Sequence, residues 1–222
     1  MAEVTITVRG EHEVRLAPER GIVHVTLRAD GPDRAPVVER VAALALAFRD
    51  QLQARQDAGT LEEWSSRQTA IWSDRPWNAD GNRLALVHYA TIDVTATFSD
   101  FAALSGWVSD ISDRDGVQVG GVEWKLTPAT RVTREREVAA EAVQVAVERA
   151  TAYARALGFD AVTPREVADL GLLGRGEGQA PQAPKMMRAA MAMDGAGGGP
   201  GLQLQPEDIV LTAAVEARFT AS

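Results

Sequence analysis

The chain has 222 residues, and the 45% that are hydrophobic supply enough apolar material for a substantial core. It has no cysteine, and 31 acidic against 23 basic residues give it a net charge of -8. The lack of cysteine excludes disulfides and thiolate nucleophiles, and the negative charge argues against a nucleic-acid partner. The sequence shows no membrane span and no signal peptide, so we expect one cytoplasmic domain over residues 1–222.

The first quarter of the chain predicts two strands and a helix. Apolar and polar residues alternate over residues 4–9 and again over residues 22–27, which is typical of half-buried strands. We expect these two strands to pair as a hairpin, with Gly10 ending the first. Apolar residues then recur at helical spacing from Pro36 to Leu52, which predicts an amphipathic helix that ends before Gly59.

A long hairpin is expected next. The alternation over residues 64–72 predicts a strand with Trp64 and Trp72 on the same face. Residues 74–82 are rich in Asp, Asn, Pro and Gly, which favour a turn. The second arm alternates over residues 84–98, with the even-numbered positions apolar apart from one histidine.

A short helix and a strand follow the hairpin. A side-chain oxygen of Ser99 or Asp100 is expected to cap a helix that runs through Ile111. The next strand, residues 117–126, changes the parity of its apolar residues at the pair Gly120–Gly121. This change predicts a β-bulge at the two glycines.

The last part of the chain predicts the longest helix, from Pro128 to Leu157, then strands near residues 167–173 and 209–220. Residues 174–206 are rich in Gly, Ala, Pro and Met and are expected to form a flexible loop. The resulting order, ββ-α-ββ-α-β-α-ββ, predicts an α+β fold in which helices cover one face of a largely antiparallel sheet. We expect the apolar stripe of the longest helix to contain Val132, Ala139, Ala142, Val143, Ala146, Ala150, Tyr153 and Leu157.

No pattern of catalytic or metal-binding residues stands out in the sequence. The three histidines, His12, His24 and His88, do not form the HExxH spacing that places two metal ligands on one helical face. We expect His88 to be a hydrogen-bonded core residue and His24 to face solvent. The serines lack the GxSxG and SxxK patterns of nucleophiles. We therefore predict no catalytic residue, no metal site and no cofactor.

Two features favour an interaction surface. Trp77 lies in the predicted turn, where an exposed indole is costly unless something covers it. Four of the five methionines, Met186, Met187, Met191 and Met193, lie close together in the predicted loop. Methionine side chains adapt to irregular surfaces and can be oxidised, so this cluster suggests packing, an adaptable contact or an oxidation-sensitive patch.

Short motifs in a characteristic order and spacing are spread over nearly the whole chain. They are Ile6-Thr7-Val8-Arg9-Gly10, Ala17-Pro18-Glu19, Tyr89-Ala90-Thr91-Ile92-Asp93-Val94, Gly121-Val122-Glu123-Trp124, Ala154-Arg155-Ala156-Leu157-Gly158 and Pro206-Glu207-Asp208-Ile209-Val210. Together these motifs resemble the SIMPL-domain family, a group of unknown function. The family pattern usually includes a signal peptide, and it has a tyrosine-rich stretch where this chain has Arg75-Pro76-Trp77. The resemblance implies an α+β fold, self-association into large rings or channel-like assemblies, and links to oxidative-stress defence.

These observations favour a non-enzymatic module that forms a homo-oligomer or binds an unknown protein partner, with the resemblance suggesting a role in the stress response. The alternatives are a small-ligand carrier, which needs an apolar pocket, and a hydrolase that uses a histidine with a carboxylate.

Overall fold

The computed structural model describes residues 3–173 and 204–222, which form three helices and seven strands in the predicted order. All the strands pair antiparallel, so the predicted α+β fold class is confirmed. The helices are α1 (Arg34–Asp57), α2 (Phe101–Ser112) and α3 (Pro128–Ala156). The strands are β1 (Val4–Leu16), β2 (Arg20–Gly31), β3 (Glu63–Asp74), β4 (Val87–Phe98), β5 (Val117–Lys125), β6 (Val162–Asp169) and β7 (Ile209–Ala221).

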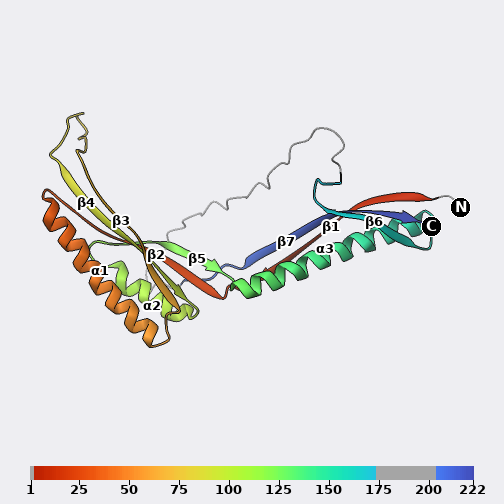
Figure 1. Ribbon diagram of the computed structural model, residues 1–222, viewed down its shortest axis with the longest axis horizontal. Helices are drawn as coiled ribbons and strands as arrows, with labels where there is room; N and C mark the ends of the chain where they lie inside the picture. Colours follow the sequence, from red (N-terminus) through yellow and green to blue (C-terminus); the bar gives the residue numbers. More distant parts are fainter. Residues whose placement is uncertain (1–2, 174–203) are drawn as a thin grey trace. The chain divides into compact units, whose positions relative to one another are not determined.

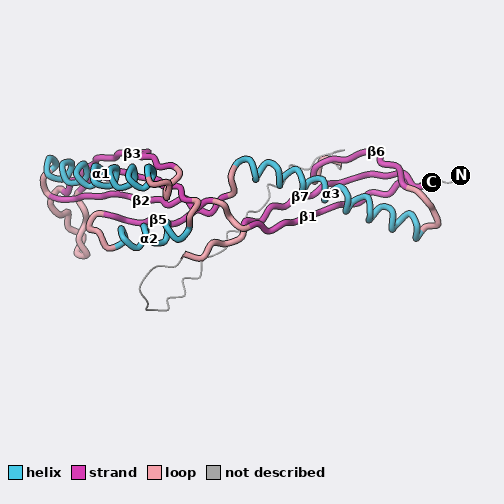
Figure 2. The backbone as a smooth tube through the Cα atoms, turned by 90° about the horizontal axis from the view of Figure 1, so that it is seen from below, coloured by secondary structure: helices cyan, strands magenta, loops and turns pink. Residues whose placement is uncertain are grey.

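The strands form two sheets, and each sheet belongs to a compact unit of its own. The terminal unit combines the two ends of the chain with α3, and its sheet has the order β1-β7-β6 (Figure 2). The central unit comprises residues 17–126 with residues 204–207, and its sheet has the order β3-β4-β2-β5. Each unit has a separate hydrophobic core.

The predicted hairpin between the first two strands is wrong. β1 pairs with β7 over its whole length, whereas β2 lies between β4 and β5. Alternation identifies a strand but carries no information about its partner, and the connection lacks a two-residue Asn-Gly or Asp-Gly turn. Gly10 does not end the strand either, because β1 continues to Leu16.

Gly10 lies inside β1 because the backbone of α3 passes directly over it. A Cβ atom at this position would be 1.9 Å from the carbonyl oxygen of Ala142. The helix can approach so closely because its buried stripe consists almost entirely of alanines at four-residue spacing. This stripe is Val138, Ala142, Ala146, Ala150 and Ala154. The predicted stripe was partly wrong, because Val132, Ala139, Tyr153 and Leu157 are exposed.

In the central unit, α1 and α2 pack on one face of the sheet over large side chains (Figure 1). Phe48, Phe98 and Trp107 are almost fully buried, and the Trp107 ring lies 5.4 Å from that of Phe98. Asp100 caps α2, as predicted, since its carboxylate accepts hydrogen bonds from the amides of Ala102 and Ala103 at 2.9 and 3.1 Å.

Two bulges change which face the side chains occupy. The predicted bulge at Gly120–Gly121 is confirmed by a register shift between β2 and β5. A second register shift, at Arg67 between β3 and β4, was not predicted. Because of it, Trp64 lies on the helix-covered face and Trp72 on the opposite face, so the prediction that they share a face is wrong.

The end of the chain differs from prediction in the position of one strand. β6 begins at Val162, before the predicted start at residue 167, and β7 is the middle strand of its sheet. Most of the predicted flexible loop, residues 174–206, lies outside the described residues. Of the helices in the described part of the chain, none is long and apolar enough to cross a membrane.

Candidate interaction surface

The most distinctive surface of the central unit is the end of the β3–β4 hairpin. β5 pairs with β2 only as far as Leu27, which lies opposite Ile92 of β4, so β3 and β4 continue beyond the four-stranded part of the sheet. They run first beside the end of β2 and, past His88, as a hairpin alone (Figure 1). Large apolar side chains remain exposed along this extension, and we call them the apolar arm. The apolar arm consists of Ile71, Trp72, Trp77, Leu84 and Leu86.

Local hydrogen bonds order the loop of the arm. The side-chain oxygen of Asn78 accepts from the amide of Asn82 at 2.8 Å and from that of Asp80 at 3.1 Å. Gly81 has a φ of 77°, a conformation that glycine adopts without strain. The Arg83 guanidinium lies 5.1 Å from the centre of the Trp77 ring, so a cation–π contact covers part of the indole. The loop therefore presents Trp77 in a defined position.

Stacking supports the base of the arm. The rings of Trp72 and Tyr89 are 5.2 Å apart and nearly parallel, at 14°. They are directly opposite each other on the sheet face that α1 and α2 leave uncovered. The sequence had no signal for this pair, because the bulge at Arg67 moves Trp72 to that face.

Of the residues predicted to form an interaction surface, Trp77 is described and is 62% exposed. The methionines Met186, Met187, Met191 and Met193 lie outside the described residues. The alternating pattern places Leu84 and Leu86 in the second strand of the hairpin, so the sequence does not identify them as surface residues. β4 begins only at Val87, so both leucines lie in the loop and are exposed.

The three histidines lie in different places. His12 is on β1 in the terminal unit, and His24 is exposed on β2, as predicted, with its Nε2 atom 3.8 Å from Glu123. His88 forms the expected hydrogen bond, 2.6 Å between its Nδ1 atom and the Ser73 hydroxyl, but it is only half-buried. Over residues 3–173 and 204–222, no group of three or more His, Asp or Glu side chains could hold a metal ion.

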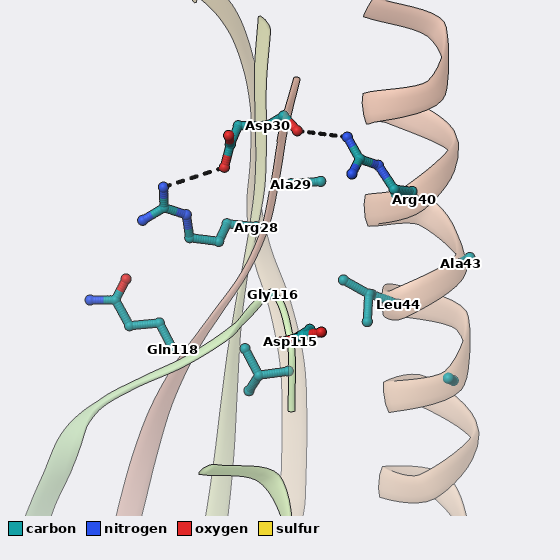
Figure 3. A pocket seen from close by; sticks show the side chains of 11 residues that line it. Arg28, Ala29, Asp30, Arg40, Ala43, Leu44, Asp115, Gly116 and Gln118 are labelled. Carbon is teal, nitrogen blue, oxygen red and sulfur yellow. Dashed lines mark hydrogen bonds and ion pairs between the residues drawn. The ribbon is translucent and has the colours of Figure 1, made fainter. Parts of the chain in front are cut away.

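An open groove of about 940 Å³ lies between α1 and the edge formed by β2 and β5 (Figure 3). Its arginines are paired. Arg40 donates to the backbone carbonyl of Asp30 at 2.6 Å, and Arg28 lies 3.6 Å from the Asp30 carboxylate. Asp115 adds a further carboxylate to the lining. The balance of charges gives the groove no strong preference for an anion.

A smaller and more apolar pocket lies on the other flank of α1, against β3 and β4. Its volume is about 360 Å³. Phe48, Leu52, Trp64 and Ile92 form part of its wall, and Arg49 is the one charged residue in the lining. We call it the α1 pocket. An apolar pocket with few polar groups suits an apolar ligand or a side chain of another molecule.

These features define an antiparallel α+β protein whose main candidate site is an apolar contact surface. The model of the SIMPL family, described as a protein of unknown function (DUF541), matches residues 6–219. The chain belongs to this family, as its motifs predicted. No curated protein matches the chain.

Proposed function

We propose that this chain is a non-enzymatic self-associating module and that the apolar arm of one copy contacts another copy. The observation that carries the proposal is the exposure of five large apolar side chains within residues 71–86. Exposed apolar groups that cluster on an ordered element favour a protein contact, because covering them removes apolar surface from water. Trp77 is the natural centre of the contact, since tryptophan is enriched among the residues that dominate binding energy.

The α1 pocket supplies a surface of matching chemistry for the arm. Its wall is mostly apolar, and its volume of about 360 Å³ is open to the exterior. An indole inserted there would contact Phe48 and Trp64. A contact between two different surfaces of the same chain is head-to-tail, and repetition of such a contact produces a ring or a filament.

The test is solution mass by light scattering over a range of concentrations. Trp77→Ala is expected to weaken self-association about tenfold or more, the loss typical of a central aromatic contact. Val167→Ala is the control, because Val167 is an exposed apolar residue of the terminal unit. A wild-type protein that remains monomeric, or a Trp77→Ala protein with unchanged mass, would refute the proposal.

A second pair of variants tests the α1 pocket. Ala42 and Ala43 are neighbours on α1 and both are exposed, but Ala42 lines the α1 pocket and Ala43 lines the groove on the opposite flank. Ala42→Glu places a charge in the apolar pocket and is expected to weaken association as much as Trp77→Ala does. Ala43→Glu adds the same charge to the same helix and is expected to leave association unchanged.

The α1 pocket also supports a second function, that of a small-ligand carrier. An apolar probe such as 8-anilinonaphthalene-1-sulfonate would bind there through its rings, with its sulfonate near Arg49. If the pocket is a ligand site, Ala42→Glu abolishes the fluorescence enhancement and Trp77→Ala preserves it. Fluorescence that does not respond to Ala42→Glu would contradict the carrier function.

The link to a stress response is a further proposal, which rests on the family resemblance. Cells without this chain are expected to survive peroxide less well than the parent strain. If the function depends on assembly, wild-type protein restores survival and the Trp77→Ala variant does not. Equal survival of the deleted and parent strains would contradict the link.

A further inference from the structure

Of the four edge strands of the two sheets, three carry features that hinder pairing with another chain and one does not. β3 and β5 each have a bulge, and β6 has both Pro164 and a register shift. Bulges and prolines at a sheet edge hinder pairing with another chain. β1 has neither, since its 13 residues pair with β7 in one unbroken register, and no strand of the described chain pairs with its other side.

We propose that two copies of this chain pair antiparallel through β1, about a two-fold axis that is perpendicular to the sheet and passes midway between the two copies of Gly10. This register aligns the whole of β1 with itself, because Gly10 is the midpoint of Val4–Leu16. The pairing joins two three-stranded sheets into one of six strands and keeps both copies of α3 on the same face. The β1 pairing uses the terminal unit, whereas the contact of the apolar arm uses the central unit, so each contact can be tested without the other.

The charges on the open face of β1 select this register. With Gly10 at the centre, Arg9 lies opposite Glu11 of the second copy, and the symmetry axis forms this ion pair twice. Moving the centre by one residue would place Arg9 opposite Arg9, or Glu11 opposite Glu11. Opposite charges across a strand pair stabilise it and like charges destabilise it. In the central register Arg15 and Glu13 face threonines, so no like charges meet.

The other face of β1 is complementary in the same register. Val4 lies opposite Leu16 of the second copy, and Ile6 lies opposite Val14, so apolar residues meet over most of the face that α3 covers. The one mixed pair on this face is Val8 with the half-buried His12. Gly10 meets Gly10, where α3 lies so close that there is no room for a side chain.

Exposed groups beside this edge fit the same contact. Tyr153 of α3 and Leu157, which follows the end of the helix, are 52% and 60% exposed, and together with Val4 and Ile6 they line an apolar groove of about 420 Å³. A second copy on the free side of β1 would cover them. The Arg9 carbonyl already accepts a hydrogen bond from Arg149 at 2.7 Å, but it has a second lone pair for a bond across the new strand pair.

Charge reversal tests the pairing, with all variants made in a Trp77→Ala background to remove the contact of the apolar arm. Arg9→Glu alone places two glutamates opposite each other, and Glu11→Arg alone places two arginines opposite each other. Each single variant is expected to weaken dimerisation at least tenfold, as measured by sedimentation. An equimolar mixture of the two is expected to recover a dimer, because the glutamate introduced at position 9 of one copy then faces the arginine introduced at position 11 of the other.

The mixture separates this contact from the ion pair within each strand. Arg9 and Glu11 of one copy are 3.0 Å apart, and both single variants break that pair whether or not the proteins are mixed. Recovery on mixing therefore reports pairing between copies. Arg15→Glu is the control, since it breaks the pair with Glu13 in the same strand but faces Thr5 of the second copy.

The proposal is overturned if the single variants dimerise as well as their Trp77→Ala parent, if mixing the two single variants restores no dimer, or if that parent is monomeric.

A covalent test uses the absence of natural cysteine. Thr7→Cys with Glu13→Cys is expected to give a disulfide-linked dimer on oxidation, because these positions lie opposite each other in the proposed register. Thr7→Cys alone is expected to give none, and equal crosslinking of both variants would also overturn the proposal.

Discussion

The two units build their cores from different materials. The central unit buries aromatic and branched side chains, among them Phe48, Phe98 and Trp107, between two helices and a sheet. The terminal unit places one long helix on its sheet through alanines, and Phe219 is the one aromatic side chain fully buried in its described core. A core of large side chains depends on volume, whereas a core of small ones depends on close backbone approach. The units should therefore respond to opposite kinds of substitution.

Truncation of a large core residue should have the largest effect on stability. Phe98 is fully buried and its ring contacts Trp107, so Phe98→Ala removes apolar burial and leaves a cavity. We expect a loss of about 4 kcal/mol in the free energy of unfolding, measured by urea denaturation. Hydrogen exchange should show the loss in β2 and β4. A change below about 1 kcal/mol would mean that the core relaxes around the cavity and the contrast between units is wrong.

In the terminal unit, the corresponding loss of stability should come from the enlargement of a small residue. Gly10→Ala places a methyl group against the backbone of Ala142, so α3 must move away from β1. We expect a loss of about 3 kcal/mol, with reduced exchange protection in β1 and α3.

Gly106→Ala is the matched control for this enlargement, because its Cβ meets nothing within 4 Å and the residue is exposed in the middle of α2. It should stabilise the protein by about 0.5 to 1 kcal/mol, since alanine favours the helix. Equal effects of Gly10→Ala and Gly106→Ala on the free energy of unfolding would contradict the close approach of α3 to β1. A single unfolding transition shifted by both Phe98→Ala and Gly10→Ala would support the prediction of one domain, and separate transitions would oppose it.

The helix caps should sharpen the comparison on a smaller scale. The Asp100 carboxylate accepts two amide hydrogen bonds at the start of α2, whereas the Thr127 hydroxyl accepts one from Thr130 at 3.3 Å at the start of α3. We expect Asp100→Ala to cost about 1 kcal/mol and Thr127→Ala about 0.5 kcal/mol by urea denaturation. The reverse order would show that the hydrogen-bond geometry does not determine the strength of the caps.

The smallest effect should come from the exposed face of α3. Arg131 and Glu135 are four residues apart and 2.8 Å from each other, and both side chains are about half exposed. Solvent screens such a pair, so Glu135→Gln is expected to lower stability by about 0.3 kcal/mol and the difference to disappear in high salt. A loss above about 1 kcal/mol would mean that the helix surface contributes more than its alanine core suggests.

The candidate contact surface could be predicted from the sequence only in part. Trp77 was identified because an indole within a turn is unusual. Trp72 was missed because the bulge at Arg67 depends on how β3 fits β4, and no glycine marks it. Leu84 and Leu86 continue the alternation of β4, so the pattern by itself could not show that pairing with β2 ends at His88.

The sequence by itself determined the type and order of the elements, a side-chain cap at Ser99 or Asp100, the bulge at Gly120–Gly121 and membership of the SIMPL family. These features depend on periodicity, side-chain oxygens and glycine, which act over a few residues. Only the tertiary structure decided that β1 pairs with β7 and that the strands form two sheets. Pairing depends on contacts between residues about 200 positions apart, and an alternating pattern is compatible with many partners.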